Sequence, residues 1–167
     1  MIDPQSPTAL RCAMYLRSAT GDRASLQEWE QACRAAASRH NPAWQIGDDL
    51  VFADPNASGI GHDRPGLATL LNQAKAKAFD MVIVATPDSF SRNMAESLQA
   101  IDLLAHHGVG VHIASTALDS RIPSFRDLFL YGRCYEEKLL RTHGENVSRG
   151  QLGALLRGGS VGGRCYG

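Results

Sequence analysis

The sequence predicts an α/β fold: a three-layer sandwich around a mainly parallel sheet of about four or five strands, followed by a long C-terminal helix. Short apolar runs alternate with helical patterns from residue 11 to residue 114. Such alternation is typical of parallel strands joined by helices that cover both faces of a sheet. A long segment without strand signals follows. We therefore expect a disordered tail over residues 1–10, an α/β domain over 11–122 and a helix over 123–150.

The first strand and helix are predicted from one apolar run and one capping pattern. Arg11–Arg17 reads RCAMYLR and predicts a strand. Ser25 and Glu28 have the spacing of a capping box, which predicts that a helix begins there. The helix should end near His40, before a proline.

A second strand is expected within Trp44–Ala53, most clearly at Leu50–Ala53, before the turn-rich loop Asp54–Asp63. Pro65 suits the first turn of a helix, where its missing N–H costs nothing. The buried stripe of that helix should contain Leu67, Leu70, Leu71 and Ala74.

Two further strands flank a third helix. Asp80–Thr86 is an unbroken apolar run, as expected for a strand covered on both faces. Asn93 and Glu96 form another capping box, Gly108 is a helix stop, and Val109–Ala114 is the next strand.

The segment after Pro123 predicts a long helix with a kink or a break near Gly144. Its sparse apolar seam consists of Leu128, Tyr131, Tyr135, Leu139 and Thr142. A narrow seam fits packing against another chain, and it fits equally well a helix lying on its own sheet. Residues 151–167 are glycine-rich and basic, and we expect a linker into a missing DNA-binding domain.

Composition excludes several classes of protein. The formal net charge is +0, which argues against a tail that coats nucleic acid by charge alone. No signal peptide and no membrane-spanning run is recognised, so a cytoplasmic protein is expected. Cysteines stand singly, with Cys12 and Cys33 in apolar patterns that predict buried thiols. Neither a metal site nor a cofactor site is expected.

Candidate site residues gather where the predicted strands end. Arg17, Arg64, Asp88 and Arg92 stand at strand ends or helix starts, which meet at one edge of a parallel sheet. Three guanidiniums near one point repel one another unless an anion lies among them, and a phosphate fits their planar geometry. The alternative is that each arginine pairs with a nearby carboxylate or faces water.

The order of several motifs resembles that of the catalytic domain of serine site-specific DNA recombinases, in particular the large serine recombinases. The motifs, in order along the chain, are YLRSAT (15–20), SGIGHDRPGLATLL (58–71), DSFSRN (88–93), HGVG (107–110), YEEKLLRTHGENVSRG (135–150) and GGRCYG (162–167). The resemblance covers nearly the whole chain.

This resemblance implies DNA cleavage and strand exchange through a serine that attacks a phosphodiester and forms a 5′-phosphoserine link. It implies that arginines hold the phosphate and neutralise the charge of the transition state. It also implies DNA as partner, a homodimer, and a tetramer in the synaptic complex, with no cofactor. The long helix would make the subunit contacts and cross the minor groove, with DNA contacts from Arg141, Arg149 and Arg157.

Carried over residue by residue, the family pattern matches in part. The matching positions are Tyr15, Arg17, Arg64, Asp88, Arg92 and Glu136. The nucleophile position holds Ala19, and a loop arginine is replaced by Ser89. A glutamine of the first helix is replaced by Trp29, and an arginine of the long helix by Glu137.

Ser18 is the neighbouring hydroxyl, but side chains alternate faces along a strand. Ser18 should therefore point away from the face that Tyr15, Arg17 and Ala19 share, unless the strand ends or bulges at Arg17. We predict a recombinase catalytic domain that is inactive or strongly impaired. The alternative is a non-catalytic DNA-binding or regulatory oligomerisation module of the same fold. A small-molecule enzyme that uses Asp88 and the arginines is a third hypothesis, which the order of the motifs disfavours.

Overall fold

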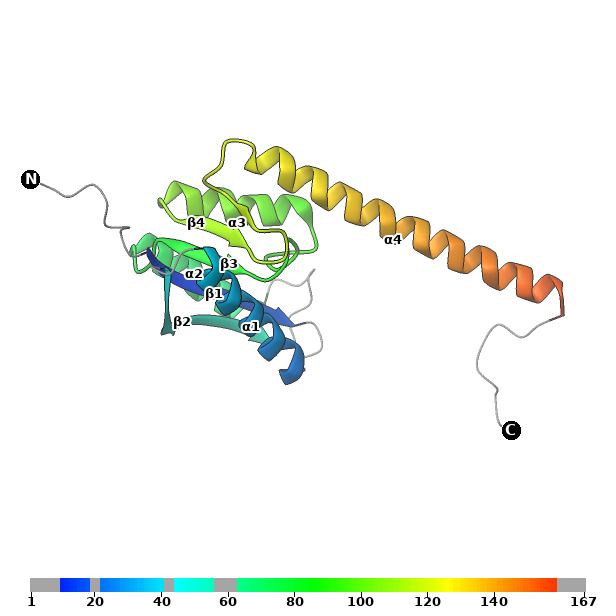
Figure 1. Ribbon diagram of the computed structural model, residues 1–167, viewed down its shortest axis with the longest axis horizontal. Helices are drawn as coiled ribbons and strands as arrows, with labels where there is room; N and C mark the ends of the chain where they lie inside the picture. Colours follow the sequence, from blue (N-terminus) through cyan, green and yellow to red (C-terminus); the bar gives the residue numbers. More distant parts are fainter. Residues whose placement is uncertain (1–9, 19–21, 41–43, 56–62, 159–167) are drawn as a thin grey trace, which may run out of the picture. The chain divides into compact units, whose positions relative to one another are not determined.

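The computed structural model describes residues 10–18, 22–40, 44–55 and 63–158 (Figure 1). The chain divides into two units, one up to Phe129 and one from Leu130.

The first unit contains a five-stranded sheet in the order β2-β1-β3-β4-β5. The strands are β1 (Leu10–Ser18), β2 (Trp44–Pro55), β3 (Met81–Val84), β4 (Gly110–Ile113) and β5 (Leu118–Asp119). The pairs β1–β2, β1–β3 and β3–β4 are parallel, and β4–β5 is antiparallel. The predicted α/β fold with a mainly parallel sheet is confirmed.

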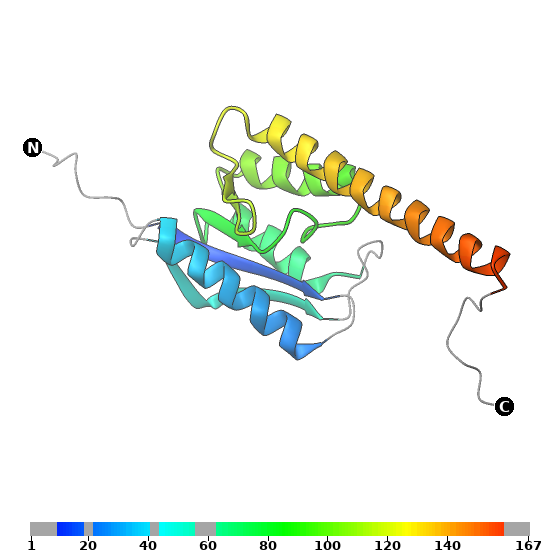
Figure 2. The ribbon, with the colours of Figure 1, turned by 45° about the vertical axis from the view of Figure 1, so that its right-hand side comes forward.

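Helices cover both faces of this sheet, as Figure 2 shows. One face packs on α1 (Arg23–His40), and the other packs on α2 (Pro65–Lys75) and α3 (Met94–His106). Side chains of β1 alternate between the two cores: Met14 and Leu16 lie on the α1 side, and Tyr15 on the α2–α3 side. The core on the α1 side also buries the thiols of Cys12 and Cys33, as expected.

The start of α1 differs from the prediction. The helix begins at Arg23, and the Asp22 carboxylate accepts the backbone N–H of Ala24 at 3.1 Å and of Ser25 at 3.3 Å. The Ser25 hydroxyl also donates to Asp22, at 3.0 Å. The predicted capping box of Ser25 and Glu28 is therefore wrong. Aspartate is as strong an N-cap as serine and stands one helical turn earlier.

The cap of α3 is confirmed in one of its two parts. The Asn93 side chain accepts the N–H of Ala95 at 2.9 Å and of Glu96 at 3.3 Å. The Glu96 carboxylate does not reach back to the N–H of Asn93, which donates to Ser91 Oγ at 3.0 Å instead. Glu96 is thus available for contacts with another element.

Strand lengths also differ from the sequence patterns. β2 starts at Trp44 and continues to Pro55, with a shift of register opposite Cys12 and Met14. β5 was not predicted, because two residues show no periodicity. The backbone N–H of Ser120, which donates to Val111 O at 2.8 Å, helps to hold it against β4.

The long helix α4 (Phe125–Leu156) begins in the first unit, where Phe125 and Phe129 are buried in the α2–α3 core. It continues without a break through Gly144, so the break that the sequence made plausible there is absent. It also passes residue 150, so residues 151–156 are helical rather than linker. Within the described part of the chain, no helix has the length and apolar character needed to cross a bilayer.

Candidate active site

Four segments supply polar side chains to the edge of the sheet where the parallel strands end. Arg17 stands near the end of β1 and pairs in register with Asp54 of β2. The segment 85–93 follows β3 and leads into α3. Arg64 directly precedes α2. The sequence placed the candidate residues at this edge, and the structure brings most of them together there.

Arg17 binds the loop after β3 with three of its hydrogen bonds. Its Nε donates to Ser89 O at 3.1 Å, and its Nη2 donates to Asp88 O at 3.0 Å and Asp88 Oδ2 at 3.4 Å. The guanidinium is buried, and burial lowers its pKa. The Asp88 carboxylate opposes this shift, whereas the positive charges of Arg92 and Arg64 add to it. Arg92 and Arg64 therefore lie close enough to Arg17 for their positive charges to act on its guanidinium.

Arg64 reaches the same loop from the start of α2. Its Nη1 donates to Phe90 O, and its Nη2 donates to Glu96 Oε2 at 3.1 Å. The same carboxylate oxygen accepts the hydroxyl of Ser91 at 2.7 Å. Glu96 therefore ties the start of α2 to the loop and to the first turn of α3.

Asp54 organises the start of α2 from the neighbouring strand. Its buried carboxylate accepts the N–H of Gly66 at 2.7 Å and of Leu67 at 2.9 Å, and the hydroxyl of Tyr15 at 2.8 Å. It thus acts as the N-cap acceptor that Arg64, the residue at the cap position, does not provide. Burial raises the pKa of Tyr15, and the hydrogen bond to Asp54 raises it further.

A tight turn shapes the loop that Arg17 and Arg64 contact. Ser89 N donates to Thr86 O at 3.1 Å, which closes a turn with Pro87 at its second position. Thr86 N donates to Ser89 Oγ at 3.1 Å, and Thr86 Oγ1 donates to Asp88 Oδ1 at 2.7 Å. The Phe90 ring that follows stacks on Tyr15, with ring centroids 5.9 Å apart.

Not every predicted site residue can be placed in this cluster. Ala19 lies outside the described residues. Ser18 is buried at the end of β1, and the alternation of the strand gives it the side of Leu16, opposite to Arg17. Arg92 is exposed next to the loop. Strand geometry thus supports the expectation that Ser18 faces away from Arg17.

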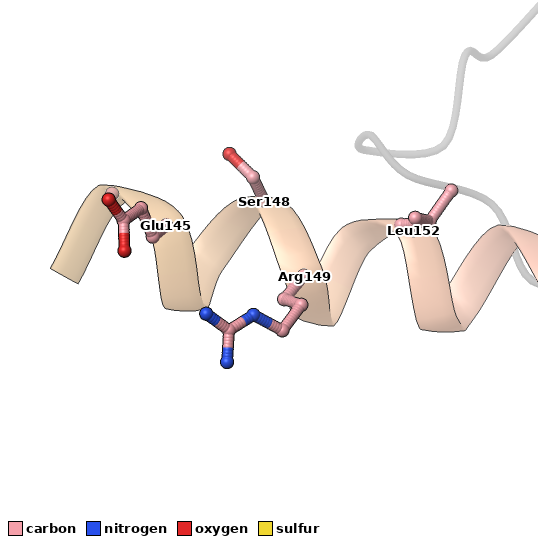
Figure 3. A pocket seen from close by; sticks show the side chains of 5 residues that line it. Glu145, Ser148, Arg149 and Leu152 are labelled. Carbon is pink, nitrogen blue, oxygen red and sulfur yellow. The ribbon is translucent and has the colours of Figure 1, made fainter. Parts of the chain in front are cut away.

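The predicted DNA contacts belong to the second unit. Arg141, Arg149 and Arg157 are all exposed, the first two on α4 and the third just after it. A shallow hollow on α4 is lined by Gly144, Glu145, Ser148, Arg149 and Leu152, all of them exposed. Figure 3 shows Ser148 and Arg149 projecting from opposite sides of the helix. Because a single helix lines it, the hollow is a surface dent and not an enclosed site.

Two carboxylates of the site were not among the predicted catalytic residues. The sequence indicates Asp54 only as the start of a turn-rich loop and Glu96 only as part of a capping box. Their partners, Gly66 and Arg64, lie 12 and 32 residues away in the sequence. The pairing of Arg17 with Asp88 and of Arg64 with Glu96 agrees with the alternative that arginines pair with carboxylates. This pairing is compatible with a phosphate site, because a guanidinium has five N–H donors.

Comparisons with known proteins identify relatives of this fold. Residues 12–157 match the family model described as Resolvase, N terminal domain. The chain is similar to the N-terminal catalytic domain of TP901-1 integrase, with a TM-score of 0.63 and 24% identity over 80% of this chain and 98% of that one. It is similar to a resolvase family site-specific recombinase from Streptococcus pneumoniae, with a TM-score of 0.60 and 16% identity over 86% and 98% of the two chains.

A third similar structure is the C-terminal catalytic domain of ISC1926 TnpA, an IS607-like serine recombinase. Its TM-score is 0.56 and its identity 21%, over 63% of this chain and 70% of that one. No curated protein sequence matches the chain. At these identities the structural likenesses show a shared fold.

Proposed function

This chain belongs to the resolvase N-terminal domain family, and from that premise we propose that it is a serine recombinase catalytic domain with an impaired covalent step. It binds a DNA phosphate with Arg17, Arg64 and Arg92. It forms little or no 5′-phosphoserine link, because its nucleophile position holds Ala19.

The observation that carries this proposal is the convergence of arginines from separate elements on one loop. Arg17 of β1 donates to Asp88 and Ser89, and Arg64 donates to Phe90. Arg17, Arg64 and the nearby Arg92 bring positive charge to this edge of the sheet. Asp88 pairs with Arg17 and Glu96 with Arg64, whereas the carboxylate of Asp54 accepts from Tyr15 and the start of α2. A phosphate is an anion that accepts several such donors at once.

The impairment follows from the residues that replace the family's reactive groups. Alanine has no nucleophilic atom. The nearest described hydroxyl, that of Ser18, occupies the strand position opposite to Arg17. Ser89 and Glu137 stand where the resemblance implies cations. Removing one stabilising donor typically slows such chemistry by about 100- to 1,000-fold.

The second candidate function is a non-catalytic module that binds DNA or regulates an active relative through oligomer contacts. The exposed seam of α4 favours it. Tyr131, Tyr135 and Leu139 are all exposed, and the two tyrosine rings stack with centroids 6.4 Å apart. We propose that this seam forms the homodimer and, in a synaptic complex, the tetramer. Arg141, Arg149 and Arg157 would then contact DNA.

Covalent trapping tests the first proposal. Wild-type protein is incubated with radiolabelled, sheared DNA from the source organism, quenched in denaturing detergent and separated on a gel. We expect no protein-sized shift for wild type and a shift for Ala19→Ser. A wild-type shift that Ser18→Ala abolishes would make Ser18 the nucleophile and contradict the proposal.

The same gel distinguishes the two functions. If Ala19→Ser also gives no covalent product, the remaining site does not support cleavage, and the non-catalytic module is favoured. Non-covalent binding is measured separately, as fluorescence anisotropy of a 40-bp duplex between 50 and 200 mM salt, where phosphate contacts give a steep salt dependence.

A further inference from the structure

We propose that Ser89 is a positioning residue: its hydroxyl locks the turn Thr86–Ser89, and through Thr86 and Asp88 it holds Arg17 in place. The inference rests on the proposed phosphate site and adds a specific role for a residue that otherwise looks like a lost cation.

The lock consists of three contacts between two residues. Ser89 N donates to Thr86 O at 3.1 Å, Thr86 N donates to Ser89 Oγ at 3.1 Å, and the two hydroxyl oxygens are 3.1 Å apart. Ser89 is only 7% exposed, so its hydroxyl is directed into the turn rather than toward a ligand in solvent. The first and last residues of the turn are therefore joined by a backbone hydrogen bond and by hydrogen bonds of the Ser89 hydroxyl.

Counting hydrogens assigns the donor in each contact. Thr86 Oγ1 has one hydrogen and lies 2.7 Å from Asp88 Oδ1, a carboxylate oxygen that accepts only. Thr86 therefore donates to Asp88, and in the contact between the hydroxyls Ser89 is the donor. The Ser89 oxygen in turn accepts the N–H of Thr86. Every hydrogen of the lock has one acceptor, which leaves a single consistent arrangement.

The lock determines where the acceptors of Arg17 lie. Asp88 is held at Oδ1 by Thr86, which leaves Oδ2 toward Arg17 Nη2 at 3.4 Å. The carbonyl oxygens of Asp88 and Ser89, both within the turn, accept from Arg17 Nη2 and Nε at 3.0 and 3.1 Å. Three acceptors of one guanidinium thus depend on the shape of this turn.

An arginine at position 89 would not form this lock. Its side chain has no acceptor for the N–H of Thr86 and is too long for the space that the serine hydroxyl fills. Compared with a loop that has arginine at position 89, this loop lacks one cation but has a turn that the serine holds in place. We expect Ser89→Arg to add one positive charge and release Arg17, with no net gain in phosphate contacts.

The lock is tested first without DNA, through the Arg17 Nε–H signal in nitrogen-15 NMR spectra. In wild type this hydrogen is bonded to Ser89 O and should exchange slowly with solvent. Ser89→Ala should speed the exchange roughly fivefold, the factor expected for loss of one hydrogen bond. Ser89→Thr keeps the hydroxyl and should restore slow exchange. Ser38→Ala, an exposed hydroxyl on α1, is the matched control.

Ser89→Cys is a second variant, of nearly the same size, in case the alanine protein does not fold. A thiol is a weak donor and acceptor, so it should behave as alanine does. Unchanged Arg17 exchange in the alanine or cysteine protein, or fast exchange in Ser89→Thr, would overturn the inference.

A DNA arm separates this inference from the proposed function. Anisotropy with the 40-bp duplex measures how steeply DNA affinity falls as salt rises, and this slope reports the number of phosphate contacts. In Ser89→Ala the slope should decrease by the equivalent of about one phosphate contact, and in Ser89→Arg it should not increase. A steeper slope for Ser89→Arg would show that Ser89 is only a missing cation. If wild type shows no salt-dependent binding, the phosphate site is wrong, while the exchange data still decide whether the lock exists.

Discussion

Tyr15 donates its phenolic hydrogen to Asp54 across 2.8 Å, and this bond joins two neighbouring strands beneath the start of α2. Both side chains are buried, with Asp54 only 2% exposed. Because Asp54 also caps α2, the bond connects the core of the sheet to the helix that carries Arg64 at its start.

Tyr15→Phe should lower the free energy of unfolding by about 1–3 kcal/mol, because it removes one donor from a buried carboxylate. The stacking of the ring on Phe90 would remain. Urea unfolding at pH 7 measures the change. Tyr131→Phe is the control, since Tyr131 is exposed and its hydroxyl should matter by less than about 0.5 kcal/mol. Equal changes in the free energy of unfolding for Tyr15→Phe and Tyr131→Phe would contradict a stabilising hydrogen bond from Tyr15 to Asp54.

Gly66→Ala should destabilise the fold by about 1–3 kcal/mol through overpacking. A Cβ at this position would lie 2.7 Å from the carbonyl oxygen of Ala53 and 2.9 Å from Asp54 Oδ1. The start of α2 must then move, and Arg64 moves with it, so DNA binding by anisotropy should weaken as well. Gly150→Ala in α4 is the control. A Cβ there meets nothing within 4 Å, and the substitution should stabilise by up to about 1 kcal/mol.

Glu96→Gln should strengthen DNA binding at low salt while changing stability by less than about 1 kcal/mol, since the carboxylate is partly exposed. The amide oxygen still accepts from Ser91 or Arg64, but the negative charge beside the phosphate site is gone. Asp49→Asn removes the same charge from an exposed position of β2 and should change affinity less. Weaker binding by Glu96→Gln would show that the charge orients Arg64 rather than competing with phosphate.

The buried thiols should make the fold sensitive to alkaline pH. Burial raises the pKa of Cys33 to about 12 and that of Cys12 to about 11, from an ordinary value of 9.0. A pKa raised by folding stabilises the native state fully below the ordinary value, and this stability is lost as pH rises toward the folded values. Each thiol should therefore cost stability only above pH 9.

Urea unfolding at pH 8 and pH 10.5 tests whether the buried thiols lower the free energy of unfolding as pH rises. Between these values wild type should lose about 2 kcal/mol more than Cys33→Ala, at about 1.4 kcal/mol per pH unit above pH 9. Cys134→Ala should lose as much as wild type, because Cys134 is exposed. Parallel pH dependence in wild type and Cys33→Ala would contradict the burial of an un-ionised thiol.

The sequence by itself determined the fold class and the edge of the sheet where the site lies. The unbroken apolar run Asp80–Thr86 predicts a strand that is buried on both faces. The carboxyl ends of parallel strands lie at one edge of the sheet. That reasoning predicts that Arg17 and Asp88 lie together, and the two side chains form an ion pair at 3.4 Å. The side assigned to Ser18 follows from the same local reasoning, since alternation is a property of the strand itself, and it stays a prediction.

Tertiary structure alone decided which acceptor each polar group uses. Asp54 caps α2 from β2, Glu96 pairs with Arg64 rather than completing its own helix cap, and β5 forms only because β4 is beside it. Competing partners of similar strength exist for each of these groups. Which partner each group binds depends on the distance in space between elements that are far apart in the sequence. The spacing of residues along the chain gives no information on that distance.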